Sequence, residues 1–279
     1  MRLIRPNFLD EVLIDEVVAE RQNGVNKTYF NGIKEKWKER IAEYVKYGGN
    51  PEKILTWSEI VDVKTKTRFL TLYNSPKDNS AQLPILRKLR ERTLQLCPAC
   101  GEDGTPNTLD HYLPKDSYPE FAISTFNLSP MCDTCQGWKL EHTLDANGAR
   151  LFLHPYFDEF LDKQVLQLEI GRPYNSPASI HIGAHADLEL DDKLLVSRHL
   201  KELHLETRYY HFFRDEYIRL LGCANDIRDA KLDMIQHFEI FCRNARRKSV
   251  NSWGHIFYES VLRNKELLIY LQTAILPKT

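Results

Sequence analysis

Apolar residues recur at helical spacing over most of the first third of the chain. Between residues 31 and 47 they stand about one helical turn apart, and Gly48-Gly49 follows as a stop signal. These apolar positions are Ile33, Trp37, Ile41 and Val45. Similar patterns predict three more helices, near residues 7–22, 65–73 and 80–94. The first of these is lined by Leu9, Val12 and Leu13 and is closed by Asn23-Gly24. We expect these apolar stripes to form a core.

The pattern changes after residue 160. Strict alternation over residues 165–170 and 178–182 predicts two short strands around Gly171-Arg172-Pro173. From about Asp187 the helical spacing returns, and the last predicted helix covers residues 253–275. His181 and His185 have the separation of a metal pair, but no further ligand stands near them, so we interpret them as surface or sheet-edge residues.

Two Cys-x2-Cys pairs stand out from this pattern. Cys97 and Cys100 form the first pair, and Cys132 and Cys135 follow after 31 intervening residues. Four thiolates in two such pairs are the ligand set of a closed, tetrahedral structural zinc site. A disulfide framework is the alternative, but 279 residues need no such staples and no signal peptide precedes Met1-Arg2-Leu3.

The other two cysteines and the lengths of the apolar runs indicate in which cellular compartment we expect the protein. Cys223 and Cys242 fall on apolar helical faces, so we expect them to be core thiols. No apolar run approaches the 18 residues needed to span a bilayer. We therefore expect a soluble protein of the reducing cytoplasm.

The segment between the cysteine pairs carries the candidate chemistry. Asp110 and His111 are adjacent, and Asn127 precedes the second pair. A carboxylate beside an imidazole can hold a metal ion while the imidazole takes a proton from water, which indicates phosphodiester hydrolysis. The alternative interpretation is a turn with a satisfied histidine, in which Asn127 caps a turn before Pro130.

Residues 97–142 resemble the HNH, or ββα-metal, nucleases whose core is clamped by four cysteines. The resemblance rests on the order Cys-x2-Cys, Asp-His, Asn-Leu, Cys-x2-Cys and the trailing Lys139. It implies a ββα core in which Asp110 is a ligand of a catalytic Mg²⁺ or Mn²⁺, His111 is the general base and Asn127 braces the loop. The family has Asn or His as a further ligand where this chain has Gln136, whose amide oxygen is also a neutral donor. His142 and His154 are the alternatives for that third ligand.

The overall prediction is an α+β protein in three regions. We expect a helical region over residues 1–92, an HNH core with a structural Zn²⁺ site over 93–160, and a β hairpin with helices over 161–279. Net charge is −1, which is low for a protein that binds nucleic acid alone. Two basic runs, 87–92 and 243–248, concentrate positive charge, and we expect the first to contact backbone phosphate because it leads into the first cysteine pair.

The layout, with His154 to Asp158 following the core, also resembles nucleases that act beside an ATPase partner in bacterial antiphage defence. That resemblance implies nucleic acid as substrate, which we expect to be DNA in preference to RNA, and a partner ATPase, since this chain has no phosphate-binding glycine loop of its own. Another alternative is a zinc-knuckle binding or scaffold protein whose nuclease site has decayed at Gln136. A free-standing homing or restriction endonuclease would need a recognition module, and the sequence contains no recognisable one.

Overall fold

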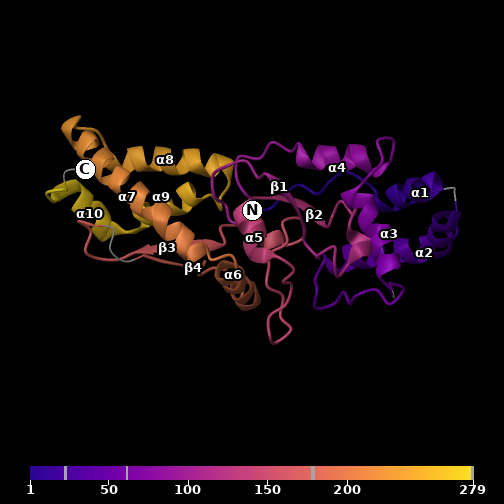
Figure 1. Ribbon diagram of the computed structural model, residues 1–279. Coiled ribbons are helices and arrows are strands. Elements are labelled where there is room, and N and C mark those ends of the chain that lie inside the picture. Colours follow the sequence, from indigo (N-terminus) through magenta and orange to yellow (C-terminus); the bar gives the residue numbers. More distant parts are fainter. Residues whose placement is uncertain (22–23, 61, 177–179, 278–279) are drawn as a thin grey trace. The chain divides into compact units, whose positions relative to one another are not determined.

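The computed structural model describes residues 1–21, 24–60, 62–176 and 180–277 and has the predicted α+β class. It divides into two compact units, labelled by their elements in Figure 1. The N-terminal unit comprises Arg2–Ala99 and Thr105–Glu159. The C-terminal unit comprises Phe160–Thr279 with Met1 and Cys100–Gly104. No helix in the described ranges is long and apolar enough to cross a membrane.

The N-terminal unit holds a two-stranded antiparallel sheet among helices. Its strands are β1 (Thr108–His111) and β2 (Leu128–Met131), with the 3₁₀ helix η1 (Pro119–Phe121) between them and α5 (Asp133–Lys139) directly after. The preceding helices are α1 (Asp10–Glu20), α2 (Gly24–Tyr47), α3 (Val63–Asn74) and α4 (Gln82–Arg90). The order of the central elements is therefore strand, strand, helix, with the second cysteine pair at the start of the helix.

The C-terminal unit pairs a second hairpin with helices. After the short η2 (Glu159–Asp162) at the boundary, β3 (Leu166–Ile170) and β4 (Ile180–Ala184) run antiparallel. The helices that follow are α6 (Leu190–Glu202), α7 (Leu205–Asp229), α8 (Met234–Lys248), α9 (Trp253–Arg263) and α10 (Lys265–Thr273). Both predicted strands are thus confirmed, although β3 begins at Leu166, one residue after the predicted start. Ala178 and Ser179 of the second strand, like Asn23 of the first predicted helix stop, lie outside the described ranges.

Alternation along β1 gives its two faces different neighbours. Leu109 joins Leu86 and Leu89 of α4 in a buried apolar cluster, which also includes Leu128 of β2. Asp110 therefore points to the other face, where α5 packs against β1. This pleat places consecutive residues of the Asp110-His111 pair on opposite sides of the hairpin.

Helices α1 and α2 fix the connection between the two strands. The Trp37 indole donates to the Glu120 carbonyl at 2.8 Å, and Arg40 pairs with the fully buried Glu120 carboxylate at 2.7 Å. The Asp10 carboxylate accepts from the Thr125 amide at 3.0 Å and the Ser124 hydroxyl at 2.5 Å. The N-terminal helices thus position residues 119–125, which border the candidate site.

Several predicted core positions are wrong. Leu9 is 75% exposed because it precedes α1, and Val12 is 47% exposed because Leu13, Ile14 and Val17 make the buried stripe. In α2 the stripe passes through Tyr44, so Val45 lies beside it and is exposed. Helical spacing defines a stripe only to within one residue, which is why these neighbours were misplaced.

Two further predictions need correction in the C-terminal unit. Cys223 and Cys242 are half-buried rather than core residues, since their neighbours, among them Leu220 and Phe238, take the buried positions of α7 and α8. The predicted helix over 253–275 is two helices. Asn264 leaves helical geometry and its side chain caps α10 by accepting from the Leu267 amide at 3.0 Å. The apolar stripe continues across this break and conceals it.

Candidate metal and phosphodiesterase site

The four cysteines of the two Cys-x2-Cys pairs come together as predicted. Their sulfur atoms all lie within 4.8 Å of one another, and three of the four side chains are buried. Tetrahedral zinc with bonds of about 2.3 Å would set neighbouring sulfurs about 3.8 Å apart. The cluster therefore has the donors and approximately the spacing that a metal ion needs.

Backbone amides point at the sulfurs of this cluster. The Cys132 amide donates to the Cys97 sulfur at 3.3 Å, and the Cys135 amide donates to the Cys132 sulfur at 3.4 Å, which caps the N-terminus of α5. Within the C-terminal unit the Arg208 guanidinium donates to the Cys100 sulfur at 3.5 Å. These donors favour the thiolate form of the cysteines. No sequence pattern indicated the Arg208 contact, because Arg208 lies 108 residues from Cys100.

Asp110 is a buried carboxylate on the α5 side of β1. It is 4% exposed, and the Lys139 ammonium lies 3.1 Å from its Oδ2 and 3.4 Å from its Oδ1. The Gln136 side chain also hydrogen-bonds this carboxylate. Burial raises the pKa of Asp110, and the charge of Lys139 opposes that rise. Asp110, Gln136 and Lys139, three residues singled out by the sequence, therefore meet at one point.

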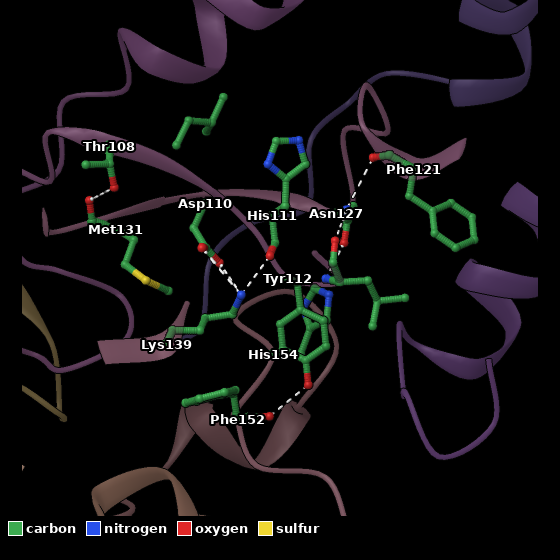
Figure 2. Close-up of polar contacts among 12 residues, drawn as sticks. Thr108, Asp110, His111, Tyr112, Phe121, Asn127, Met131, Lys139, Phe152 and His154 are labelled. Atoms are coloured by element: carbon green, nitrogen blue, oxygen red, sulfur yellow. Dashed lines mark hydrogen bonds and ion pairs between the residues drawn. The ribbon is translucent and has the colours of Figure 1, made fainter. Parts of the chain in front are cut away.

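His111 lies on the opposite side of β1. Figure 2 shows its ring pointing away from the Asp110 carboxylate, while its backbone carbonyl accepts from Lys139 at 2.7 Å. One ring nitrogen, Nε2, hydrogen-bonds the Ala122 carbonyl at 2.9 Å. Because a carbonyl can only accept, Nε2 carries the proton and Nδ1 has the lone pair. Burial lowers the pKa of His111 to about 3, so the ring is neutral at pH 7.

Asn127 makes the cross-loop contacts expected of it. Its Oδ1 accepts from the Leu113 amide at 2.7 Å, and its Nδ2 donates to the carbonyls of Leu113 at 3.0 Å and Phe121 at 3.2 Å. The side chain is fully buried. It thereby ties the chain that follows His111 to the segment that carries Ala122.

A buried network supports Asn127 from behind. The Tyr44 hydroxyl lies 3.0 Å from Asn127 Oδ1 and 3.0 Å from His154 Nε2, and His154 Nδ1 accepts from the Tyr156 amide at 3.1 Å. Both ring nitrogens of His154 are thus engaged, which disfavours it as a metal ligand, while His142 is exposed on the surface. Tyr44 was missed, although a tyrosine on the buried stripe of α2 signals a buried hydroxyl that needs a partner.

The segment from His154 to Asp158 folds back on the hairpin. The Tyr156 hydroxyl donates to the Leu128 carbonyl of β2 at 2.9 Å. Asp158 accepts from the His154 amide at 2.6 Å and pairs with Arg150 at 2.9 Å. This segment therefore acts as a structural support of the site.

His154 gives the fold a pH dependence. Burial lowers its pKa well below the ordinary value of 6.5, so the folded chain keeps it neutral while the unfolded chain protonates it below about pH 6.5. Since the unfolded state then binds the extra proton, His154 makes stability fall as pH falls through this range, by about 1.4 kcal/mol per pH unit.

The matched comparison is His154→Gln, measured by denaturant unfolding from pH 7.5 to 5. The buried carboxyl groups that also titrate are common to both proteins and cancel in the difference. We expect the wild-type stability to fall more steeply with decreasing pH than that of the variant. Parallel curves for the two proteins would contradict a neutral, buried His154.

The two basic runs have different surroundings. In the first, Arg87, Lys88 and Arg90 are exposed on α4, whereas Arg92 donates to the Tyr156 hydroxyl at 3.0 Å. The second run lies at the end of α8, where Lys248 pairs with Asp103 at 2.8 Å. Three side chains of the first run thus remain directed to solvent close to the hairpin.

Comparisons with known proteins give little guidance on function. The chain is similar to protein ea31 of Escherichia phage lambda, with 29% identity over 115 residues. The match covers 40% of this chain and 39% of ea31, so the chain spans about two-fifths of that relative. No family model matches the chain, and no solved structure matches it.

Proposed function

We propose that this protein is a metal-dependent HNH endonuclease that hydrolyses phosphodiester bonds of nucleic acid, with DNA preferred to RNA. The observation that carries the proposal is the buried Asp110 carboxylate, faced by Gln136 and followed in the chain by a neutral His111. The arrangement occurs within a strand, strand, helix order whose helix begins at the second cysteine pair. Asp110 and His111 are consecutive residues at the end of β1, with their side chains on opposite faces of the strand.

The donors around Asp110 fit a hard divalent cation. The Asp110 carboxylate is buried beside the Gln136 amide, and its Oδ2 lies 3.1 Å from the Lys139 ammonium. One carboxylate and one amide oxygen match Mg²⁺ or Mn²⁺, since Mg²⁺ typically takes one or two protein ligands and keeps several waters. In this proposal Asp110 and Gln136 would hold the ion, with the Gln136 amide, which donates to Asp110 here, turned so that its oxygen faces the ion. The ion would supply charge stabilisation at the phosphate.

His111 supplies the proton acceptor in this proposal. Its Nε2 proton is directed to the Ala122 carbonyl, which leaves the Nδ1 lone pair to accept a proton from the attacking water. Asn127 keeps this carbonyl in place by binding Phe121 and Leu113. A Zn²⁺ ion on the four cysteines would hold the start of α5, and with it Gln136 and Lys139, against β1.

An ATPase partner and a role in antiphage defence complete the proposal. They rest on the resemblance given above and on the net charge of −1. A chain with so little positive charge is expected to depend on a partner for binding nucleic acid. Co-purification with the product of a neighbouring ATPase gene tests this part separately.

A zinc-stapled scaffold with a decayed nuclease site is the second candidate. The observation in its favour is Lys139, which is 1% exposed and places its own positive charge against the proposed ligand Asp110. Divalent-ion binding separates the two functions, because a decayed site keeps Lys139 in place of the ion. Strand cleavage with Mg²⁺ or Mn²⁺, compared with cleavage in a chelator, is the direct test.

Gln136 provides a graded test of the metal site. Gln136→Asn keeps an amide oxygen and should retain measurable cleavage, whereas Gln136→Ala should weaken the divalent ion by about 10–100-fold. Mn²⁺ binding followed by electron paramagnetic resonance, with cleavage over a Mg²⁺ titration, measures both effects. Thr134→Ala, an exposed change on the same helix, is the control. Equal Mn²⁺ affinity in Gln136→Ala and wild type would remove Gln136 from the site.

A further inference from the structure

Tyr73 of α3 covers the imidazole of His111. The two ring centroids lie 4.4 Å apart, with the rings at 74° in an edge-to-face contact. The Tyr73 hydroxyl donates to the Leu109 carbonyl of β1 at 3.4 Å, which fixes the phenol ring against the strand. His111 itself is only 8% exposed. Tyr73 is half-buried, so its ring separates the imidazole from solvent on this side.

Arg90 also contacts the Tyr73 ring. Its guanidinium carbon is 5.4 Å from the Tyr73 ring centroid, within the range of a cation–π contact. Arg90 is exposed, and no carboxylate in the described ranges pairs with it. By contrast, Lys66 and Lys115 both pair with Asp116, at 3.1 and 2.9 Å. Arg90 is therefore a positive group that shares Tyr73 with His111 and that no acidic side chain of the described residues neutralises.

We propose that Arg90 binds a backbone phosphate of the nucleic acid and that Tyr73 is a positioning residue that aligns this phosphate with His111. The guanidinium is planar and suits two-point contact with phosphate oxygens, and stacking on an aromatic ring restricts its orientation. Tyr73 contacts both the guanidinium and the imidazole, so one ring sets the anchor and the base relative to each other. This inference rests on the proposed nuclease function and identifies a residue that would contact the nucleic-acid substrate.

The first test measures nucleic-acid binding in a chelator, where no cleavage occurs. Arg90→Ala should bind an end-labelled DNA about tenfold more weakly than wild type. The slope of log affinity against log salt should also fall by about one. Arg87→Ala is the matched comparison, because Arg87 is an exposed arginine of the same basic run, one turn earlier on α4. It should weaken binding by less than Arg90→Ala does. Equal losses in the two variants would overturn the specific role of Arg90.

The second test reads His111 directly through its reaction with diethyl pyrocarbonate, followed by mass spectrometry of the peptide. Tyr73→Ala should be modified at His111 severalfold faster than wild type, because the cover is removed. DNA should protect His111 in wild type and in Arg87→Ala but not in Arg90→Ala. No protection by DNA in wild type, or equal protection in all three proteins, would overturn the proposal.

These readouts do not depend on turnover. If wild type fails to cleave but Arg90→Ala alone loses binding and protection, the phosphate contact stands and the nuclease function fails. If wild type cleaves and Arg90→Ala behaves like Arg87→Ala in both tests, the nuclease function stands and this inference fails.

Discussion

Cys132→Ser is expected to abolish binding of the proposed zinc ion and to unfold the segment from about residue 97 to residue 139. Cys132 supplies one of four clustered sulfurs and also caps α5 by accepting from the Cys135 amide at 3.4 Å. Structural zinc typically contributes about 10–16 kcal/mol of apparent binding free energy, and this free energy becomes folding free energy where the site forms only in the folded chain. Removing one thiolate therefore has a larger effect than any single cavity in the core.

Elemental analysis of the purified protein should find about one zinc per chain in wild type and much less in Cys132→Ser. Thermal unfolding should show a large loss of stability in the same variant. Cys242→Ser is the matched control, since Cys242 is half-buried in α8 and does not belong to the cluster. A Cys132→Ser protein with full zinc content and unchanged unfolding would refute the zinc assignment.

His111→Ala should abolish cleavage while zinc content and fold remain. A general base typically contributes about 10²–10⁴-fold to the rate, and His111 has a neutral ring with Nδ1 free to accept a proton. Asp110→Ala should be similarly inactive through loss of the divalent ion. Single-turnover cleavage rates at saturating Mg²⁺ measure both effects.

The control for His111→Ala is His142→Ala, an exposed histidine just after α5. It should cleave at the wild-type rate. If His111→Ala cleaves as fast as His142→Ala, the activity belongs to another residue or to a contaminant.

Local spacing was sufficient to predict the sulfur cluster, and the family resemblance indicated the other groups of the site. The two Cys-x2-Cys pairs predicted the sulfur cluster, because each pair is compact and the metal geometry accepts few other arrangements. The cross-loop bonds of Asn127 were expected from the family resemblance, and an asparagine in a turn commonly hydrogen-bonds the backbone. The roles of Asp110 and His111 in catalysis stay predictions.

The contacts that surround these groups could not be predicted from the sequence. Tyr44 meets Asn127 across 83 residues, and Arg208 meets Cys100 across 108, so both depend on tertiary packing with no local signal. The ion pair of Lys139 with Asp110 follows from α5 packing on one face of β1, which spacing alone does not fix. The break at Asn264 was hidden because a capping asparagine can lie within a continuing apolar stripe.

The most direct test of the account is strand scission by the purified wild-type chain, alone and with its candidate ATPase partner. DNA and RNA of defined sequence, labelled at the 5′ or 3′ end, are incubated with Mg²⁺ or Mn²⁺ or with a chelator, and the ends of the products are analysed. The account predicts cleavage that requires the divalent ion, with DNA cut in preference to RNA, and the resemblance to HNH nucleases implies 5′-phosphate ends. Intact DNA and RNA under every one of these conditions would contradict it and favour the scaffold.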